Sequence, residues 1–289
     1  MESPAQTVSR SATAISTGFS PSSDATARRC QPLLGTYVEI AASGPEGTVS
    51  LAITRAFDAI RRVQGLMSHH DPASELSRVN REAWRCPVPV HPWTLRVLRS
   101  ARQLSGETHG AFDPTPPTHG QRGRAGTWED VELRPDGRIR FRRPLQLDLG
   151  GIAKGFAVDR AVEVLRRLGM TRGWVNAGGD LRSFGGVPRT VHLRHPVLGA
   201  VLSESLPLGD AALATSAPTF TFGALGVPGR RGLLDPRSRS PLNAPRSVTV
   251  LAPTCLWADA LTKVVWVLGT ESAPVLRRHR ARAWVLETS

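Results

Sequence analysis

The sequence predicts a mixed α/β fold, with mixed or antiparallel sheets and flanking helices. Four long segments space their apolar residues at the three- and four-residue interval of a helix, and short alternating or apolar segments between them read as strands. Two turn sequences, Pro135-Asp136-Gly137 and Ala177-Gly178-Gly179, separate neighbouring strands. Residues 1–28 are rich in Ser, Thr, Ala and Pro, so we expect a disordered tail followed by one domain at 29–289.

The first half of the domain alternates strands and helices. Residues 33–40 read as a strand interrupted by Gly35, and residues 48–67 as an amphipathic helix. A short helix is expected at 74–80. A longer helix at 92–104 closes at Gly106, just before the turn-rich segment that contains Ala111, Phe112 and Asp113.

A strand, a glycine turn and a helix form the centre of the sequence. Residues 128–141 read as a hairpin, and the alternation continues from residue 138 to 149, which favours one long strand. Gly150-Gly151 breaks that strand, and a helix then runs to Gly169. A glycine turn before a helix N-terminus exposes free N–H groups to an anion. We expect Asp148, Lys154 and Asp159 to surround this turn.

The second half adds short strands and one further helix. Strands are predicted at 173–176, 180–184, 191–193, 201–206, 247–251 and 281–286, with a loop rich in Pro and Arg at 217–245. A helix around 257–268 closes at Gly269. Asp259, Thr262 and Lys263 share one flank of it, either as a surface ion pair or as oxygen ligands for a hard cation.

Lysine is rare in this chain. Of the 37 basic residues only two are lysines, Lys154 and Lys263. Because arginine is used almost everywhere else, the choice of lysine at these two positions indicates that a compact ammonium group is needed there.

Net charge, aromatic content and the length of the apolar runs limit which partners and which cell compartment we expect for this chain. The formal charge of +13 indicates an anionic partner or simply an Arg-rich chain. The chain has one tyrosine among scattered arginines, which argues against a stacking platform for nucleic acid. The apolar runs are too short for a membrane span. The N-terminus lacks an apolar signal segment, so we expect a cytoplasmic protein as the sequence stands, and a periplasmic one if the true start lies upstream.

Eight segments, taken together and in order, resemble the flavin transferase (ApbE-type) family, whose members are FAD:protein FMN transferases. They are LLGTYVEI at 33–40, MSHHDPASELSRVN at 67–80, GAFDPT at 110–115, LDLGGIAKGFAVD at 147–159, WVNAGGDL at 174–181, ALATSAPTF at 212–220, LLDPRSRSP at 233–241 and SVTVLAPTCLWADALTKVVWVLG at 247–269. The resemblance implies a mixed α/β fold with FAD lying across a groove.

The resemblance also implies an activity and its residues. Such an enzyme uses Mg²⁺, moves FMN from FAD to a Ser or Thr hydroxyl of an acceptor protein, and releases AMP. The positions that would contact FAD are Leu34, Ala111, Phe112, Asp113, Asp148, Lys154 and Leu234. The carbonyl of Gly151 with Asp259 and Thr262 would hold Mg²⁺. Asp259 and Asp235 would be the catalytic carboxylates, with Asp235 or a metal-bound water removing the hydroxyl proton.

Two departures from the family pattern keep other functions open. Lys263 stands where the family usually has a threonine metal ligand, and Gly232 where it often has a histidine suited to deprotonating the acceptor. A Mg²⁺-dependent FAD pyrophosphatase giving FMN and AMP is one alternative. A degenerate FAD-binding protein, with Lys263 in place of the cation, is another.

Overall fold

A seven-stranded antiparallel sheet runs through the computed structural model, which describes residues 24–115, 126–194, 202–217, 234–238, 240, 242 and 246–287. The strand order is β1-β2-β6-β7-β10-β11-β12. Their bounds are β1 Asp24–Leu33, β2 Thr36–Pro45, β6 Arg172–Ala177, β7 Asp180–Phe184, β10 Ala212–Ser216, β11 Arg246–Ala252 and β12 Arg282–Glu287. The sheet and the helices against it confirm the mixed α/β prediction.

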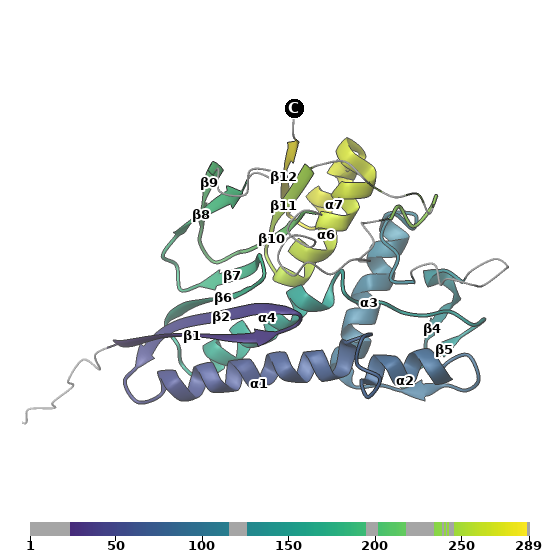
Figure 1. Ribbon diagram of the computed structural model, residues 1–289, viewed down its shortest axis with the longest axis horizontal. Helices are drawn as coiled ribbons and strands as arrows, with labels where there is room; N and C mark the ends of the chain where they lie inside the picture. Colours follow the sequence, from purple (N-terminus) through teal and green to yellow (C-terminus); the bar gives the residue numbers. More distant parts are fainter. Residues whose placement is uncertain are drawn as a thin grey trace, which may run out of the picture.

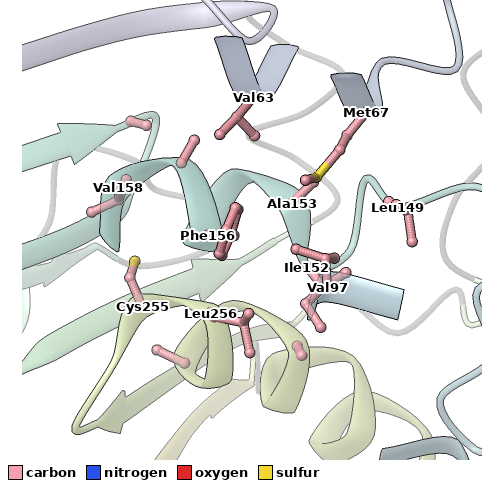
Figure 2. Packing of buried hydrophobic residues seen from close by; sticks show 14 of the residues in the cluster. Val63, Met67, Val97, Leu149, Ile152, Ala153, Phe156, Val158, Cys255 and Leu256 are labelled. Atoms are coloured by element: carbon pink, nitrogen blue, oxygen red, sulfur yellow. The ribbon is translucent and has the colours of Figure 1, made fainter. Parts of the chain in front are cut away.

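Three helices form a layer against this sheet (Figure 1). They are α1 Val49–Met67, α4 Ala153–Arg167 and α6 Cys255–Leu268. Helix α4 packs between the other two and also contacts β6 and β7, while α6 contacts β10 and β11. Figure 2 shows the core where they meet, with Phe156 and Val158 of α4 beside Cys255 and Leu256 of α6.

A hairpin covers part of the opposite face of the sheet. It consists of β8 Arg189–Arg194 and β9 Leu202–Leu208. Leu193 and Leu208 pack with Leu213 of β10, whereas the flanking Ala212 and Ala214 belong to the core under the helices. This alternation is the two-residue period of a strand that is buried on both faces.

The remaining elements form a smaller lobe beside the helical layer (Figure 1). It contains α2 Glu75–Glu82, α3 Pro92–Glu107, the short helix η1 Trp128–Asp130 and a three-stranded sheet in the order β3-β5-β4. These strands are β3 Val88–Pro89, β4 Val131–Leu133 and β5 Arg138–Phe141. A turn η2 Gly269–Ser272 and helix α7 Ala273–Arg278 lead from α6 to β12.

Three sequence predictions differ from the structure. Residues 33–40, read as one strand interrupted by Gly35, are the end of β1, a turn, and the start of the antiparallel strand β2. Strand β1 begins at Asp24, inside the segment assigned to the disordered tail, because its backbone pairs with β2 from Asp24↔Pro45 onward and needs few buried side chains. The strand predicted at 138–149 ends at Phe141. Leu145, Leu147 and Leu149 are buried as the alternation implies, but Asn80 replaces the partner strand by pairing with the N–H and C=O of Leu147 at 2.8 and 2.9 Å.

Helices in the described part of the chain are all too short or too polar to cross a membrane.

Candidate active site at the start of helix α4

The glycine turn delivers the chain directly into α4, as the sequence predicted. Gly150-Gly151 precedes the helix, whose N-cap residue Ile152 provides no side-chain hydrogen bond to it. The N–H of Gly155, in the first turn of α4, has no acceptor within its own helix. It donates a 3.0 Å hydrogen bond to Oδ2 of Asp259 in α6. The start of α4 is therefore joined to α6 by the carboxylate that the sequence singled out.

Gly155 allows these two helices to approach closely. A Cβ atom at this position would lie 2.2 Å from the carbonyl oxygen of Cys255 and 2.8 Å from Cβ of Asp259. No side chain larger than hydrogen fits without moving the backbone. The glycine thus sets the distance between Asp259 and the first turn of α4.

Two carboxylates and two ammonium groups meet at this junction, and we call Lys154, Asp180, Asp259 and Lys263 the carboxylate–ammonium cluster. Nζ of Lys154 lies 3.2 Å from Oδ2 of Asp180, the first residue of β7. Nζ of Lys263 pairs with Oδ1 of Asp259 and lies 3.1 Å from its backbone oxygen. The side chains of Asp180 and Asp259 are 2% and 0% exposed, so the reading of Asp259 and Lys263 as a surface ion pair is wrong.

The cluster changes the acidity of its members. Burial and the nearby Asp259 carboxylate raise the pKa of Asp180 to about 7, although the two ammonium groups oppose this. Burial also acts against ionisation of Asp259, but Lys263 and Lys154 outweigh it and hold the pKa of Asp259 below its ordinary value. Burial lowers the pKa of Lys154, and the two carboxylates more than reverse that shift. Asp259 and Lys154 are therefore charged at neutral pH.

Asp159 does not join this cluster, contrary to the expectation that it borders the glycine turn. Its Oδ1 and Oδ2 each accept a hydrogen bond of 2.9 Å, from the N–H groups of Cys255 and Leu256, and Arg182 donates to Oδ1 at 2.6 Å. Burial raises the pKa of Asp159 despite these donors. The carboxylate caps the N-terminus of α6, whose own N-cap Thr254 makes no side-chain bond to the helix.

Asp148 lies on the solvent side of the same turn. Its Oδ1 accepts from the N–H of Gly150 at 2.7 Å and lies 3.1 Å from Nδ1 of His69. Burial opposes ionisation, yet His69 and the Gly150 N–H together hold the pKa of Asp148 below its ordinary value. Among the described residues no group of three or more His, Cys, Asp and Glu side chains is arranged to hold a metal ion.

The segment with Ala111, Phe112 and Asp113 borders the turn from α3. A Cβ on Gly151 would lie 3.6 Å from both Cε2 of Phe112 and Cε of Lys263. Ala111 is 1% exposed and Phe112 5%. Asp113 accepts hydrogen bonds from the N–H and hydroxyl of Thr115 at 2.8 and 2.6 Å, and burial raises its pKa despite them. Its carboxylate holds the segment in shape.

Leu34 lies in the tight turn between β1 and β2. Leu34 and Gly35 have φ values of 56° and 70°, the conformation of a two-residue hairpin turn, and the N–H of Leu34 donates to Gln64 at 2.8 Å. A Cβ on Gly178, in the turn before Asp180, would lie 2.5 Å from Oγ1 of Thr36. The β1–β2 and β6–β7 turns therefore lie side by side.

Asp235 is held within its own turn. Its carboxylate pairs with the guanidinium of Arg237 at 3.1 Å and accepts from the Arg237 N–H at 2.9 Å. Burial raises the pKa of Asp235, but the Arg237 contacts outweigh it and lower the pKa overall. A weakly basic carboxylate is a poor acceptor for a hydroxyl proton. Leu234 beside it is half-buried, while Gly232 lies outside the described residues.

The structure thus brings together most of the predicted positions and adds one that the sequence reasoning missed. Phe112, Asp148, Gly151, Lys154, Asp259 and Thr262 gather around the start of α4. Asp180 was not singled out, because nothing in its local sequence shows that it is buried beside Lys154. The one signal was the rarity of lysine, since both lysines of the chain belong to the cluster.

Open grooves occur on another part of the surface. One of about 640 Å³ lies along α3 and is lined by Arg99, Arg102, Glu107, Trp128 and Arg278, among others. The residues of the carboxylate–ammonium cluster do not line it.

Comparisons with known proteins find several curated relatives of this chain. Among curated relatives, "FAD:protein FMN transferase" from Vibrio cholerae is 28% identical over 272 residues, covering 83% of this chain and 80% of that protein. One of the same name from Klebsiella pneumoniae is 27% identical over 250 residues, covering 78% of each. Both matches span most of the two chains compared.

Solved structures show the same fold. The apbe protein of Thermotoga maritima aligns with a TM-score of 0.78 at 23% identity, covering 91% of this chain and 94% of that one. "Flavin Transferase ApbE from Vibrio cholerae" aligns with a TM-score of 0.76 at 25% identity, covering 92% and 94%. The sequence model of the ApbE family matches residues 34–285, from the β1–β2 turn to β12, and so includes the whole site: this chain belongs to the ApbE family.

Proposed function

We propose that this chain transfers FMN from FAD to a Ser or Thr hydroxyl of an acceptor protein and releases AMP. The observation that carries the proposal is the carboxylate–ammonium cluster at the start of α4, in a chain of the ApbE family. Two ammonium groups beside a helix N-terminus form a suitable environment for a pyrophosphate. The curated relatives carry the name of this reaction.

The reaction breaks one P–O bond and forms another. The acceptor oxygen attacks the phosphorus of the FMN half, and the bond to the AMP phosphate oxygen breaks, so AMP leaves with the electron pair. Lys154, held by Asp180 at 3.2 Å, is placed to neutralise the charge that develops on the phosphate oxygens. The hydroxyl proton must pass to a base, and Asp235 is disfavoured for that role by its pairing with Arg237.

The FAD-binding part of the proposal rests on where the expected residues lie. Phe112 borders Gly151, and Lys154 lies in the first turn of α4. The N–H of Asp148 donates a 2.8 Å hydrogen bond to the carbonyl of Pro114, which joins it to the 110–115 segment. We propose that these positions, with Ala111 and Leu34, contact FAD. The half-buried Leu234 belongs to the same proposal.

Magnesium is the ion that the family resemblance implies. It would be held by Asp259, Thr262 and the carbonyl of Gly151, and when bound it would polarise the phosphate for attack. As the residues lie, they do not fit it. The ammonium group of Lys263 pairs with Oδ1 of Asp259 and its stem passes Gly151, so a positive charge already lies where the ion would bind, and the N–H of Gly155 donates to Oδ2. No step of the proposed reaction passes through a metal ion.

Release of AMP from FAD tests this function against the two alternatives. The full chain is incubated with FAD, with and without a Ser-containing acceptor peptide, and AMP is measured by chromatography. Release that requires the peptide supports transfer. Equal release without it would instead support the pyrophosphatase, and FAD binding without release would support the non-catalytic protein.

A further inference from the structure

Lys263 lies where a cation would neutralise Asp259. Its ammonium group pairs with Oδ1 and lies 3.1 Å from the backbone oxygen of the same residue. The stem of the side chain runs past Gly151, because a Cβ there would lie 3.6 Å from Cε of Lys263. The family pattern places a metal ion at Gly151, Asp259 and Thr262. The side chain of Lys263 pairs with Asp259 and passes beside Gly151.

Both carboxylate oxygens of Asp259 already have donors, the ammonium group of Lys263 at Oδ1 and the N–H of Gly155 at Oδ2. A lysine at helix position i+4 from an aspartate could have remained in solvent, but the side chain of Lys263 is only 22% exposed. It is held in the site.

Each ammonium group of the cluster pairs with one carboxyl group, Lys154 with Asp180 and Lys263 with Asp259. A divalent cation entering this group would add two positive charges next to an ammonium ion. It would also have to displace that ion from Oδ1 of Asp259, which Mg²⁺ needs as a ligand.

We propose that the ammonium group of Lys263 is the resident cation of this site, and that the chain binds the pyrophosphate of FAD without a divalent metal ion. The inference rests on the proposed function, since it concerns the same substrate. It concerns the binding of a pyrophosphate diester by two lysines from different helices, Lys154 of α4 and Lys263 of α6.

The first test uses the unmodified chain and two readouts that do not require turnover. Mn²⁺, a paramagnetic substitute for Mg²⁺, is titrated into the protein with and without FAD and followed by electron paramagnetic resonance. FAD affinity is measured by flavin fluorescence in EDTA and in excess Mg²⁺. We expect no Mn²⁺ site tighter than about 1 mM, and FAD dissociation constants that agree within about twofold.

A matched pair of variants tests the role of Lys263 itself. Lys263→Thr and Lys263→Met both remove the ammonium group, but only the threonine adds an oxygen ligand. We expect Lys263→Thr to bind Mn²⁺ at least about tenfold more tightly than the unmodified chain, and to need Mg²⁺ for full FAD affinity. In EDTA, Lys263→Met should bind FAD about tenfold more weakly than the unmodified chain.

Opposite results would overturn the inference. One is a Mn²⁺ site of micromolar affinity in the unmodified chain, and another is FAD binding that EDTA abolishes. If circular dichroism shows that both variants misfold, the Mn²⁺ titration and the FAD affinities of the unmodified chain still test the inference. Failure of the proposed function looks different: the acceptor peptide would stay unmodified, while the Mn²⁺ titration of the free protein would still report whether Lys263 excludes the metal.

Discussion

Asp159 of α4 caps helix α6 by accepting a 2.9 Å hydrogen bond from the N–H of Cys255, 96 residues further along the chain. Its second oxygen accepts from Leu256, and Arg182 of β7 neutralises it. Because α6 also carries Asp259, this one carboxylate orients the helix that supplies half of the carboxylate–ammonium cluster.

Asp159→Asn should therefore destabilise the protein. The amide keeps one acceptor oxygen but leaves one N–H of α6 and the guanidinium of Arg182 without a carboxylate, at a cost of about 1–3 kcal/mol in the free energy of unfolding. Urea denaturation measures it. Asp58→Asn is the control, since Asp58 lies on the surface of α1 and pairs there with Arg55 and Arg61. Equal stability of the two variants would refute the capping role.

Gly155→Ala should be more damaging. The added methyl group would meet the carbonyl oxygen of Cys255 at 2.2 Å and must push α4 and α6 apart, which we expect to cost about 2 kcal/mol or more. Gly65→Ala is the matched control on α1, because a Cβ there meets nothing within 4 Å. That change should stabilise the protein by about 0.5 kcal/mol, through better helix propensity. Calorimetric melting of both variants would show opposite shifts, and a shift in the same direction would contradict the close approach.

Local sequence patterns predicted the helices and strands of this fold, but they did not predict the long-range contacts between them. Helices α1 and α4 and the β6–β7 hairpin follow directly from apolar spacing and glycine turns. The strand predicted at 138–149 was too long because the partner of Leu147 is Asn80, a side chain 67 residues away. Such a substitute for a strand leaves no trace in the alternation itself.

The site was predictable only in part, for the same reason. Asp148, Lys154 and Asp259 stand in recognisable segments, and the structure places them around one turn. The role of Asp180 is visible only from the contact of β7 with α4, where it pairs with Lys154. The role of Asp159 is visible only from the contact of α4 with α6, where it accepts the N–H of Cys255. Both are carboxylates whose partners are distant in sequence, so spacing alone could not assign their roles.

Asp180 should make the stability of the protein depend on pH. Its pKa is about 7 in the folded protein against 3.8 ordinarily, so between these values the folded state binds more protons than the unfolded state. The free energy of unfolding should then fall as pH rises from about 4 to about 7. Asp180→Asn removes this contribution. Urea denaturation across that range should show the unmodified chain losing stability relative to Asp180→Asn, and parallel curves would argue against the raised pKa.

Lys154 should contribute to FAD binding through its position and not through the net charge of the chain. Lys154→Met is expected to weaken FAD binding by about tenfold or more, because a charge-assisted contact to phosphate is lost. Arg99→Met removes the same formal charge from the groove along α3 and should leave FAD affinity unchanged. Flavin fluorescence titration of both variants measures this. Equal losses would mean that FAD is attracted by the basic surface as a whole.

The most direct test of the proposed function is the mass of an acceptor peptide after incubation with FAD and the full chain. Transfer predicts that the peptide gains the mass of FMN less one water, that AMP appears in equal amount, and that replacing its acceptor Ser by Ala abolishes both. A peptide of unchanged mass, whether or not AMP is released, would contradict the account.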